Sequence, residues 1–285
     1  MYSHVLNTAN KIPVLGIGTF QIKLETEIEN VLDSAFQNGY RLVDTAAVYH
    51  NESHIGRCLP QLLEKHGLTR NDVFITTKIG PKDMGKGAVQ ALDQSLSNLG
   101  IPYVDLYLIH WPGKQGLKHD DQQNREFRRQ TWLALAEEFR KTSKMRALGV
   151  SNFTIKHLEE LKTYSDLTPA VLQNEFHPDY SQIDLKEYCE ENNIFFQSYS
   201  SLGKAKLIND SRFYNVAKKH NKSVSQILLR WCLQQNCGVI PMSKNPLHIA
   251  ENANIFDFTL DEHDMKEIRG CSKQEKYAWD PKYIF

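Results

Sequence analysis

The sequence predicts a (β/α)8 TIM barrel, an α/β fold, in a single domain spanning residues 1–285 with a short N-terminal β-hairpin. Eight short segments rich in apolar and β-branched residues alternate with amphipathic helical patterns, and no linker interrupts them. Such alternation requires parallel strands with right-handed crossovers. Eight units in a chain of 285 residues fit a closed barrel better than an open doubly wound sheet.

The elements follow from local patterns in chain order. A turn at residues 7–10 within an apolar stretch at 5–15 predicts the hairpin. The eight strands are predicted at residues 15–20, 41–46, 73–78, 104–110, 146–151, 170–176, 194–199 and 238–242. Apolar residues at helical spacing predict helices at 25–37, 52–65, 88–99, 127–140, 155–161, 185–191, 212–219, 225–234 and 249–252. The polar segment 114–124 is predicted to be a loop.

Charge and cysteine content narrow the function classes. The 34 basic and 34 acidic residues cancel, so no strong positive field favours nucleic acid or an anionic membrane surface. No run approaches the roughly 18 apolar residues of a membrane span, and the N-terminus lacks a signal-peptide pattern. The five cysteines (Cys58, Cys189, Cys232, Cys237 and Cys271) are scattered without C-x-x-C spacing. We therefore expect a cytoplasmic protein with neither a zinc knuckle nor a disulfide framework.

In a barrel of this kind the catalytic groups lie at the C-terminal ends of the strands. Those ends carry Thr19, Phe20, Asp44, Lys78, His110, Ser151, Asn152, Gln173, Tyr199, Met242 and Ser243. Tyr49 follows Asp44 by five residues, in the loop above the second strand. Each of these residues alone is typical of capping or packing. Together, an aspartate, a lysine and a histidine ending three successive strands indicate a site, and a buried lysine and aspartate must pair.

This combination of side chains favours proton donation to an oxygen. A tyrosine titrates near 10, and we expect the Lys78 ammonium to lower that pKa while Asp44 holds the lysine charged. A neutral His110 would hydrogen-bond a carbonyl oxygen. No activated serine or cysteine nucleophile and no metal-binding motif is apparent. The attacking group is therefore expected to be hydride from a nicotinamide cofactor.

Three motifs carry a resemblance to a known family. Residues 42–52, 149–153 and 240–246 resemble the first, second and third signatures of the aldo-keto reductases, and the resemblance runs from the hairpin to Pro281. It implies NADPH-dependent reduction of aldehydes and ketones to alcohols. It also implies a catalytic tetrad of Asp44, Tyr49, Lys78 and His110, with Tyr49 the proton donor.

The resemblance also implies a cofactor site. Ser151, Asn152 and Gln173 would bond the nicotinamide carboxamide, and Tyr199 would stack on the ring. Ser200 and Leu202 would lie along the pyrophosphate, Glu251 and Asn252 near the adenine. Thr19, Phe20 and Asp44 are further expected cofactor contacts.

The chain departs from the family pattern where the 2′-phosphate binds. That pattern reads Ile-Pro-Lys-Ser with an arginine six residues after the lysine, but Met242 and His248 stand at those positions here. Two cations are lost, and charge-assisted contacts to phosphate are the strong ones. Ser243, Lys244, Asn245 and His248 would compensate in part. We expect NADPH as the cofactor, with NADH as the alternative.

The expected substrate is a small-molecule aldehyde or ketone bound by a monomer. Tyr49 and His110 would contact its oxygen, and Phe20 and Trp111 would supply apolar walls. The few residues after the segment 279–281 predict an open pocket that accepts small or varied carbonyl compounds. Two other functions stay open: a metal-dependent barrel hydrolase, and a non-enzymatic, crystallin-like use of a reductase fold.

Overall fold

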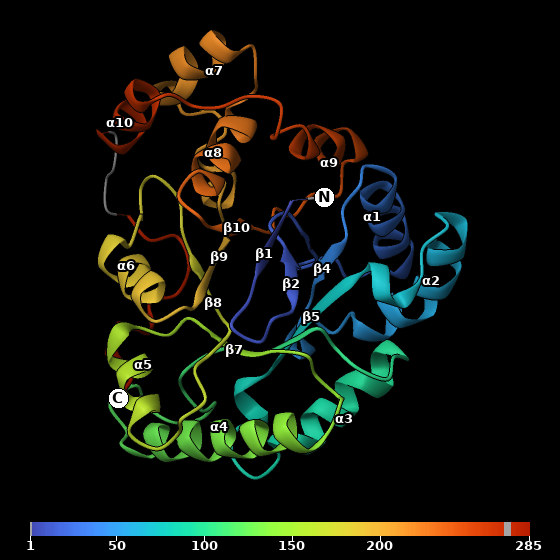
Figure 1. Ribbon diagram of the computed structural model, residues 1–285, viewed down its shortest axis with the longest axis vertical. Coiled ribbons are helices and arrows are strands. Elements are labelled where there is room, and N and C mark those ends of the chain that lie inside the picture. The colour runs from blue at the N-terminus through green and yellow to red at the C-terminus, as the bar shows by residue number, and fades with distance from the viewer. Residues whose placement is uncertain (1, 271–274) are drawn as a thin grey trace.

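The predicted barrel is present in the structure, a computed structural model that describes residues 2–270 and 275–285 (Figure 1). Eight parallel strands are neighbours in chain order from β3 to β10. A parallel bridge between Leu15 and Val239 closes the ring, and the Gly16 N–H donates to the Val239 carbonyl at 2.9 Å. The strands are β3 (Ile17–Gly18), β4 (Leu42–Asp44), β5 (Phe74–Ile79), β6 (Leu106–Ile109), β7 (Leu148–Ser151), β8 (Val171–Glu175), β9 (Phe195–Tyr199) and β10 (Gly238–Val239).

An antiparallel hairpin of β1 (Ser3–Val5) and β2 (Lys11–Pro13) covers one end of the barrel. Leu6 and Ile12 of this hairpin region are buried in the same apolar cluster as Leu42, Phe74 and Leu106, the first residues of three barrel strands. The hairpin therefore closes the end at which the strands begin, and it lies across the centre of the barrel in Figure 1. The hairpin does not cover the opposite end of the barrel, where the strands finish and the predicted site residues lie.

Helices surround the strands. Those that follow the barrel strands are α1 (Glu25–Gln37), α2 (Glu52–Lys65), α3 (Ala88–Leu99), α4 (Gln123–Lys141), α5 (Ile155–Lys162), α6 (Ile183–Glu191), α7 (Tyr214–His220), α8 (Val224–Leu233), α9 (Pro246–Ala253) and α10 (Glu262–Gly270). The first three have the predicted bounds. α4 begins four residues earlier than predicted because its first turn, Gln-Asn-Arg-Glu, is polar and adds nothing to an apolar period. α10 was not predicted, since Met265 and Ile268 are its only large apolar residues.

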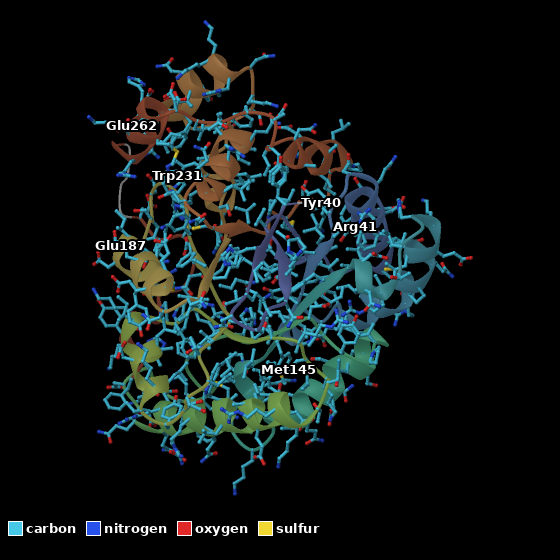
Figure 2. All side chains as sticks on the ribbon, viewed as in Figure 1. Tyr40, Arg41, Met145, Glu187, Trp231 and Glu262 are labelled. Atoms are coloured by element: carbon cyan, nitrogen blue, oxygen red, sulfur yellow. The ribbon has the colours of Figure 1, made fainter. Side chains whose placement is uncertain are left out.

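The main apolar core lies between the strands and the helices. Trp231 of α8, labelled in Figure 2, is buried there and stacks on Phe176 with ring centroids 5.2 Å apart. Glu187 of α6 and Glu262 of α10 lie on the outer, exposed faces of their helices (Figure 2). Core packing of this kind fixes where each strand ends, and so where the side chains at the mouth of the barrel lie.

Two features noted in the sequence, the cysteines and the lack of a long apolar run, can be followed among the described residues. Cys58, Cys189, Cys232 and Cys237 are buried free thiols, and Cys271 lies outside the described residues. Among the described helices, none combines the length and the apolar character that crossing a bilayer requires.

Candidate active site

A buried ion pair lies at the centre of the barrel mouth. Lys78 Nζ donates to Asp44 Oδ1 at 2.6 Å and to the Thr45 carbonyl at 2.8 Å. Lys78 is fully buried and Asp44 is 2% exposed, so neither charge is tolerable without the other. Burial lowers the pKa of Lys78, and Asp44 opposes that shift by stabilising the ammonium. The pairing predicted from the strand ends is confirmed.

Tyr49 lies on a short 3-10 turn, η1 (Ala47–Tyr49), directly after β4. The Lys78 ammonium lies over its ring, 5.0 Å from the centroid. The ring centroids of His110 and Phe20 lie 5.6 Å and 5.1 Å from that of Tyr49. The turn thus brings the Tyr49 phenol beside Lys78, His110 and Phe20, which the sequence placed at strand ends.

The expected direction of the Tyr49 pKa was wrong. Burial raises the pKa of Tyr49 well above its usual value, and the nearby Asp44 and Tyr199 raise it further. The physical reason is that burial removes the phenolate from water, and this desolvation outweighs the attraction of the Lys78 ammonium, which the paired Asp44 offsets in part. The Tyr49 hydroxyl is therefore fully protonated at neutral pH, the state a proton donor requires.

His110 is neutral. Its burial and the adjacent Lys78 charge hold its pKa well below the usual range. Its Nδ1 is buried and has no hydrogen-bond partner among the described residues. The backbone of His110 is held in place by Asn152 Nδ2, which donates to its carbonyl at 2.9 Å. A neutral imidazole at this position can hydrogen-bond a carbonyl oxygen without competing for the proton of the phenol.

The residues predicted to hold the nicotinamide gather at the ends of β7 and β9 and, for Gln173, in the middle of β8. Ser151 Oγ donates to the Gln173 carbonyl at 2.7 Å, and the Tyr199 hydroxyl donates to Asn152 Oδ1 at 2.6 Å. Asn152 and Ser200 adopt left-handed φ angles of 61° and 51°. Non-glycine residues in this region concentrate at functional sites, where the surrounding structure enforces the strain.

The residues predicted along the rest of the cofactor occupy three further positions. Thr19 lies beside the ion pair, and its hydroxyl donates to the Asp44 carbonyl at 2.9 Å. Leu202 is partly buried in the loop after β9. The others lie between β10 and the end of α9, and they are Met242, Ser243, Lys244, Asn245, His248, Glu251 and Asn252.

Several of those residues already have partners within the protein. Lys244 Nζ lies 2.9 Å from both carboxylate oxygens of Glu27 on α1. Asn245 Oδ1 accepts from the Leu247 N–H as the N-cap of α9. Glu251 accepts from the Ser223 hydroxyl. Lys244, the lysine expected to compensate for the two cations missing at the 2′-phosphate site, therefore faces the Glu27 carboxylate. No local sequence pattern predicted this contact.

An adjacent cleft of about 480 Å³ opens beside Trp111. The Trp111 and Trp279 rings meet edge to face at 4.7 Å, and His119 lies 5.0 Å from Trp279. Trp111 in turn stacks on His110 at 6.2 Å, which joins the cleft to the ion pair. Trp111 was predicted as a wall of the pocket, but Trp279 and His119 were not, because neither follows the end of a strand.

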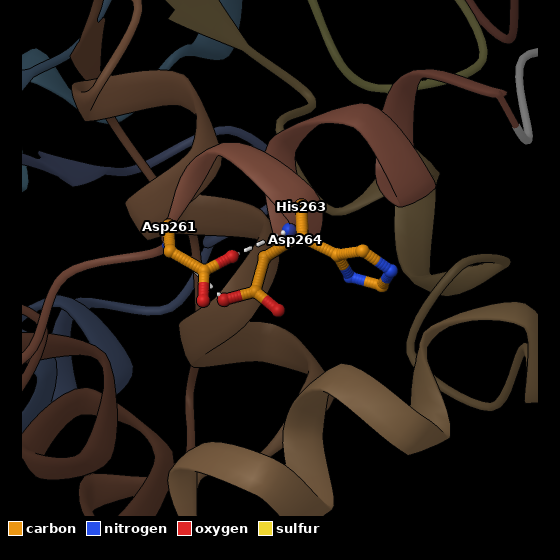
Figure 3. Close-up of side chains that lie close together, drawn as sticks. All are labelled: Asp261, His263 and Asp264. Atoms are coloured by element: carbon orange, nitrogen blue, oxygen red, sulfur yellow. Dashed lines mark hydrogen bonds between the residues drawn. The ribbon is translucent and has the colours of Figure 1, made fainter.

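A separate group of potential metal ligands, Asp261, His263 and Asp264, lies at the start of α10 (Figure 3). Asp264 Oδ2 accepts from the Asp261 N–H at 3.1 Å, and Asp261 Oδ1 accepts from the Asp264 N–H at 2.9 Å. Lys219 Nζ contacts both carboxylates, and His220 contacts Asp264. These carboxylates thus cap a helix and carry their own counter-charges, and they do not favour the hydrolase alternative.

Comparisons with known proteins agree with this geometry. A model of the aldo/keto reductase family matches residues 14–273. The glyoxal reductase of Bacillus subtilis (strain 168) is 39% identical over 277 residues, 97% of this chain and 95% of its own. An aldo-keto reductase from a Medee basin deep-sea metagenome library is 35% identical, with a TM-score of 0.89 over 98% of each chain. A Bombyx mori aldo-keto reductase solved in complex with NADP is 30% identical, with a TM-score of 0.88 over 97% of this chain and 94% of its own. The chain therefore belongs to the aldo/keto reductase family, and it is an oxidoreductase.

Proposed function

We propose that this protein reduces an aldehyde or ketone to an alcohol, with Tyr49 as the proton donor. The observation that carries the proposal is the buried Lys78–Asp44 pair, with its ammonium 5.0 Å from the Tyr49 ring centroid. A lysine is not buried at this cost merely to stabilise a barrel. Its charge is held where it stabilises the negative charge that grows on the phenol oxygen as the proton leaves.

Each neighbouring residue has one role in this proposal. His110, kept neutral by burial, orients the substrate oxygen towards the Tyr49 hydroxyl. Asp44 keeps Lys78 charged and fixes the position of its ammonium group. Tyr49 gives its proton to the carbonyl oxygen, and this proton together with a hydride on the carbonyl carbon would complete the alcohol. The phenolate that remains is stabilised by Lys78.

The chemistry of the polar groups at the mouth fits a nicotinamide dinucleotide. A bound cofactor of this class would supply the hydride that adds to the carbonyl carbon. Ser151, Asn152 and Gln173 offer one hydroxyl and two amides, which match the donors and acceptors of a carboxamide. Tyr199 offers a partly exposed ring face for stacking. Ser200 and Leu202 would lie along the pyrophosphate, with Glu251 and Asn252 near the adenine.

For the cofactor we propose NADPH, with NADH as the alternative. The Bombyx mori relative was solved with NADP, which supports the phosphorylated form. Two features weaken the binding of a 2′-phosphate: Met242 carries no charge, and Lys244 faces Glu27. Comparing the Kd of NADPH and NADH by quenching of protein fluorescence decides between them, and equal or tighter binding of NADH would contradict the preference.

The proposed substrates are small or varied aldehydes and ketones. A Bacillus subtilis relative is named for glyoxal, and the cleft beside Trp111 has room for a larger apolar body. The direct test is oxidation of NADPH and NADH, followed at 340 nm, against a panel of aldehydes, ketones and sugars. Strong preference for a bulky steroid over short aldehydes would contradict this substrate range.

The role of Tyr49 has its own test. Tyr49→Phe removes only the hydroxyl, so we expect loss of carbonyl reduction with the cofactor Kd almost unchanged. Reduction at a rate near that of the wild type would refute the assignment. Cofactor binding without turnover in the unmodified protein would instead favour the crystallin-like alternative.

A further inference from the structure

Asn51 is a fully buried amide whose hydrogen bonds all lead to the surroundings of Tyr49. Its Nδ2 donates to the Thr19 and Ile22 carbonyls at 2.9 Å and 3.0 Å. Its Oδ1 accepts from the Thr45 hydroxyl at 2.6 Å. Both donor hydrogens and the acceptor of the amide are used, so its orientation is fixed.

From its position in the chain, Asn51 would be expected to cap a helix, but the structure shows no capping bond from its side chain. Asn51 is the N-cap of α2, where an asparagine usually accepts a bond from the first turn of its helix. Here its side chain makes no such capping bond. The amide instead turns towards the loop after β3 and the end of β4. The bonds it makes are therefore not explained by helix capping.

These bonds connect Asn51 to the ion pair. The Thr45 carbonyl accepts from Lys78 Nζ at 2.8 Å, while the Thr45 hydroxyl donates to Asn51. Thr19, whose carbonyl accepts from Asn51, donates through its own hydroxyl to the Asp44 carbonyl at 2.9 Å. The loop held by Asn51 also carries Phe20, whose ring lies 5.1 Å from that of Tyr49.

The turn that carries Tyr49 packs only partly against the protein. Its three residues are half-buried, and the following residue, His50, has a left-handed φ of 57°. The Tyr49 ring packs against neighbouring aromatic side chains, but these contacts do not tie the backbone of the turn to the loop after β3. Asn51 does, because its three bonds reach Thr45 before the turn and the Thr19 and Ile22 carbonyls in that loop.

We propose that Asn51 is a positioning residue that holds the Tyr49 turn and the Phe20 loop in register with Lys78. This inference rests on the proposed function, because it matters only if Tyr49 donates the proton. A displacement of about 1 Å in a reacting group can reduce a rate by about 100-fold. Loss of the Asn51 bonds therefore slows reduction while the cofactor residues on β7, β8 and β9 stay in place.

A pair of variants at Thr45 isolates one bond. Thr45→Val keeps the shape and removes the hydroxyl that donates to Asn51 Oδ1, whereas Thr45→Ser keeps the hydroxyl. We expect kcat to fall about 10-fold in Thr45→Val, with recovery to within about 2-fold of wild type in Thr45→Ser. The cofactor Kd should change much less than kcat in both, because most of the expected cofactor contacts lie on or just beside β7, β8, β9 and α9. The solvent deuterium isotope effect on kcat should increase in Thr45→Val, because proton transfer from a misplaced phenol becomes slower.

A second variant acts on Asn51 itself. Asn51→Asp keeps the acceptor for Thr45 and sets carboxylate oxygen against the Thr19 and Ile22 carbonyls, so we expect kcat to fall about 100-fold. The matched control is Asp105→Asn, the reverse substitution at a buried residue just before β6. Asp105 bonds the Ile75 N–H and Arg70 at the opposite end of the barrel. Its loss should lower the melting temperature without changing kcat of the folded enzyme.

The outcomes separate this inference from the proposed function. The role of Asn51 is overturned if kcat falls as far in Thr45→Ser as in Thr45→Val. It is also overturned if a folded Asn51→Asp variant has the kcat and the isotope effect of the wild type. Should Asn51→Asp not fold, the Thr45 pair alone decides. Tyr49→Phe, measured in parallel, tests the function: if it keeps full activity, the proton donor is misassigned whatever the Asn51 variants do.

Discussion

Gln173 and Asp44 stand 129 residues apart in the chain, and Gln173 Nε2 donates to Asp44 Oδ2 at 2.7 Å. The other oxygen of Asp44 accepts from Lys78. A residue proposed to hold the nicotinamide is thus bonded directly to the ion pair beneath Tyr49. The two halves of the proposed site, on β4–β6 and on β7–β9, form one buried polar network across the barrel.

Replacing Gln173 should destabilise the protein as well as weaken cofactor binding. Gln173→Met leaves Asp44 Oδ2 buried without a partner, which costs about 1–3 kcal/mol of unfolding free energy. Gln197→Met is the matched control, because Gln197 accepts from Gln173 at 2.8 Å and makes no bond to Asp44. Urea unfolding and the NADPH Kd measure both effects. Equal stability of the two variants would show that the bond to Asp44 contributes nothing.

Lys78→Met should abolish reduction and destabilise the fold. Leaving Asp44 unpaired in the barrel costs about 3–5 kcal/mol, and the phenol loses the charge that stabilises its anion. The double variant Lys78→Met with Asp44→Asn removes the unpaired charge, so we expect it to regain stability and stay inactive. Calorimetry and NADPH oxidation check the two effects. Recovery of activity in the double variant would mean that the pair serves stability alone.

Glu27 should set the affinity for the phosphorylated cofactor. Glu27→Gln releases Lys244 from its ion pair, so we expect several-fold tighter NADPH binding, a larger gain at low ionic strength, and no change for NADH. Glu29→Gln, two residues along α1 and exposed, is the control for net charge. If both variants tighten NADPH binding equally, the effect is a general one and the 2′-phosphate does not lie at Lys244.

His157 should make stability depend on pH. Burial, and then the Arg128 charge, lower its pKa to about 3, while its Nε2 lies 3.1 Å from the Ile284 carbonyl. Between pH 6.5, where the unfolded histidine titrates, and pH 3, only the unfolded state binds this proton. Stability is therefore complete above pH 6.5 and falls as the pH decreases, by up to about 1.4 kcal/mol per pH unit.

The matched variant for that prediction is His157→Gln, which cannot titrate and keeps an acceptor at the third position of α5. Urea unfolding at pH 7 and pH 5 should show a smaller loss of stability in this variant than in the wild type. His110 shifts in the same direction and is present in both proteins, so the difference between the two slopes belongs to His157. Identical slopes would disprove its contribution.

Local patterns in the chain were enough for the barrel and for part of the site. Helices α1, α2 and α3 follow from apolar spacing alone, because each buries one stripe of side chains. Asp44, Lys78 and His110 were predicted to meet because parallel strands all finish at one mouth. The polar first turn of α4 adds nothing to an apolar period, and the two large apolar residues of α10 make a period too short to detect.

Apart from the Lys78–Asp44 pair, only the tertiary structure decided which polar groups pair. The bond from Gln173 to Asp44, the ion pair of Lys244 with Glu27 and the use of Asn51 join segments far apart in the chain. The direction of the Tyr49 pKa was also beyond the sequence. An electrostatic shift depends on burial and on distances between side chains, and these exist only once the whole barrel has closed.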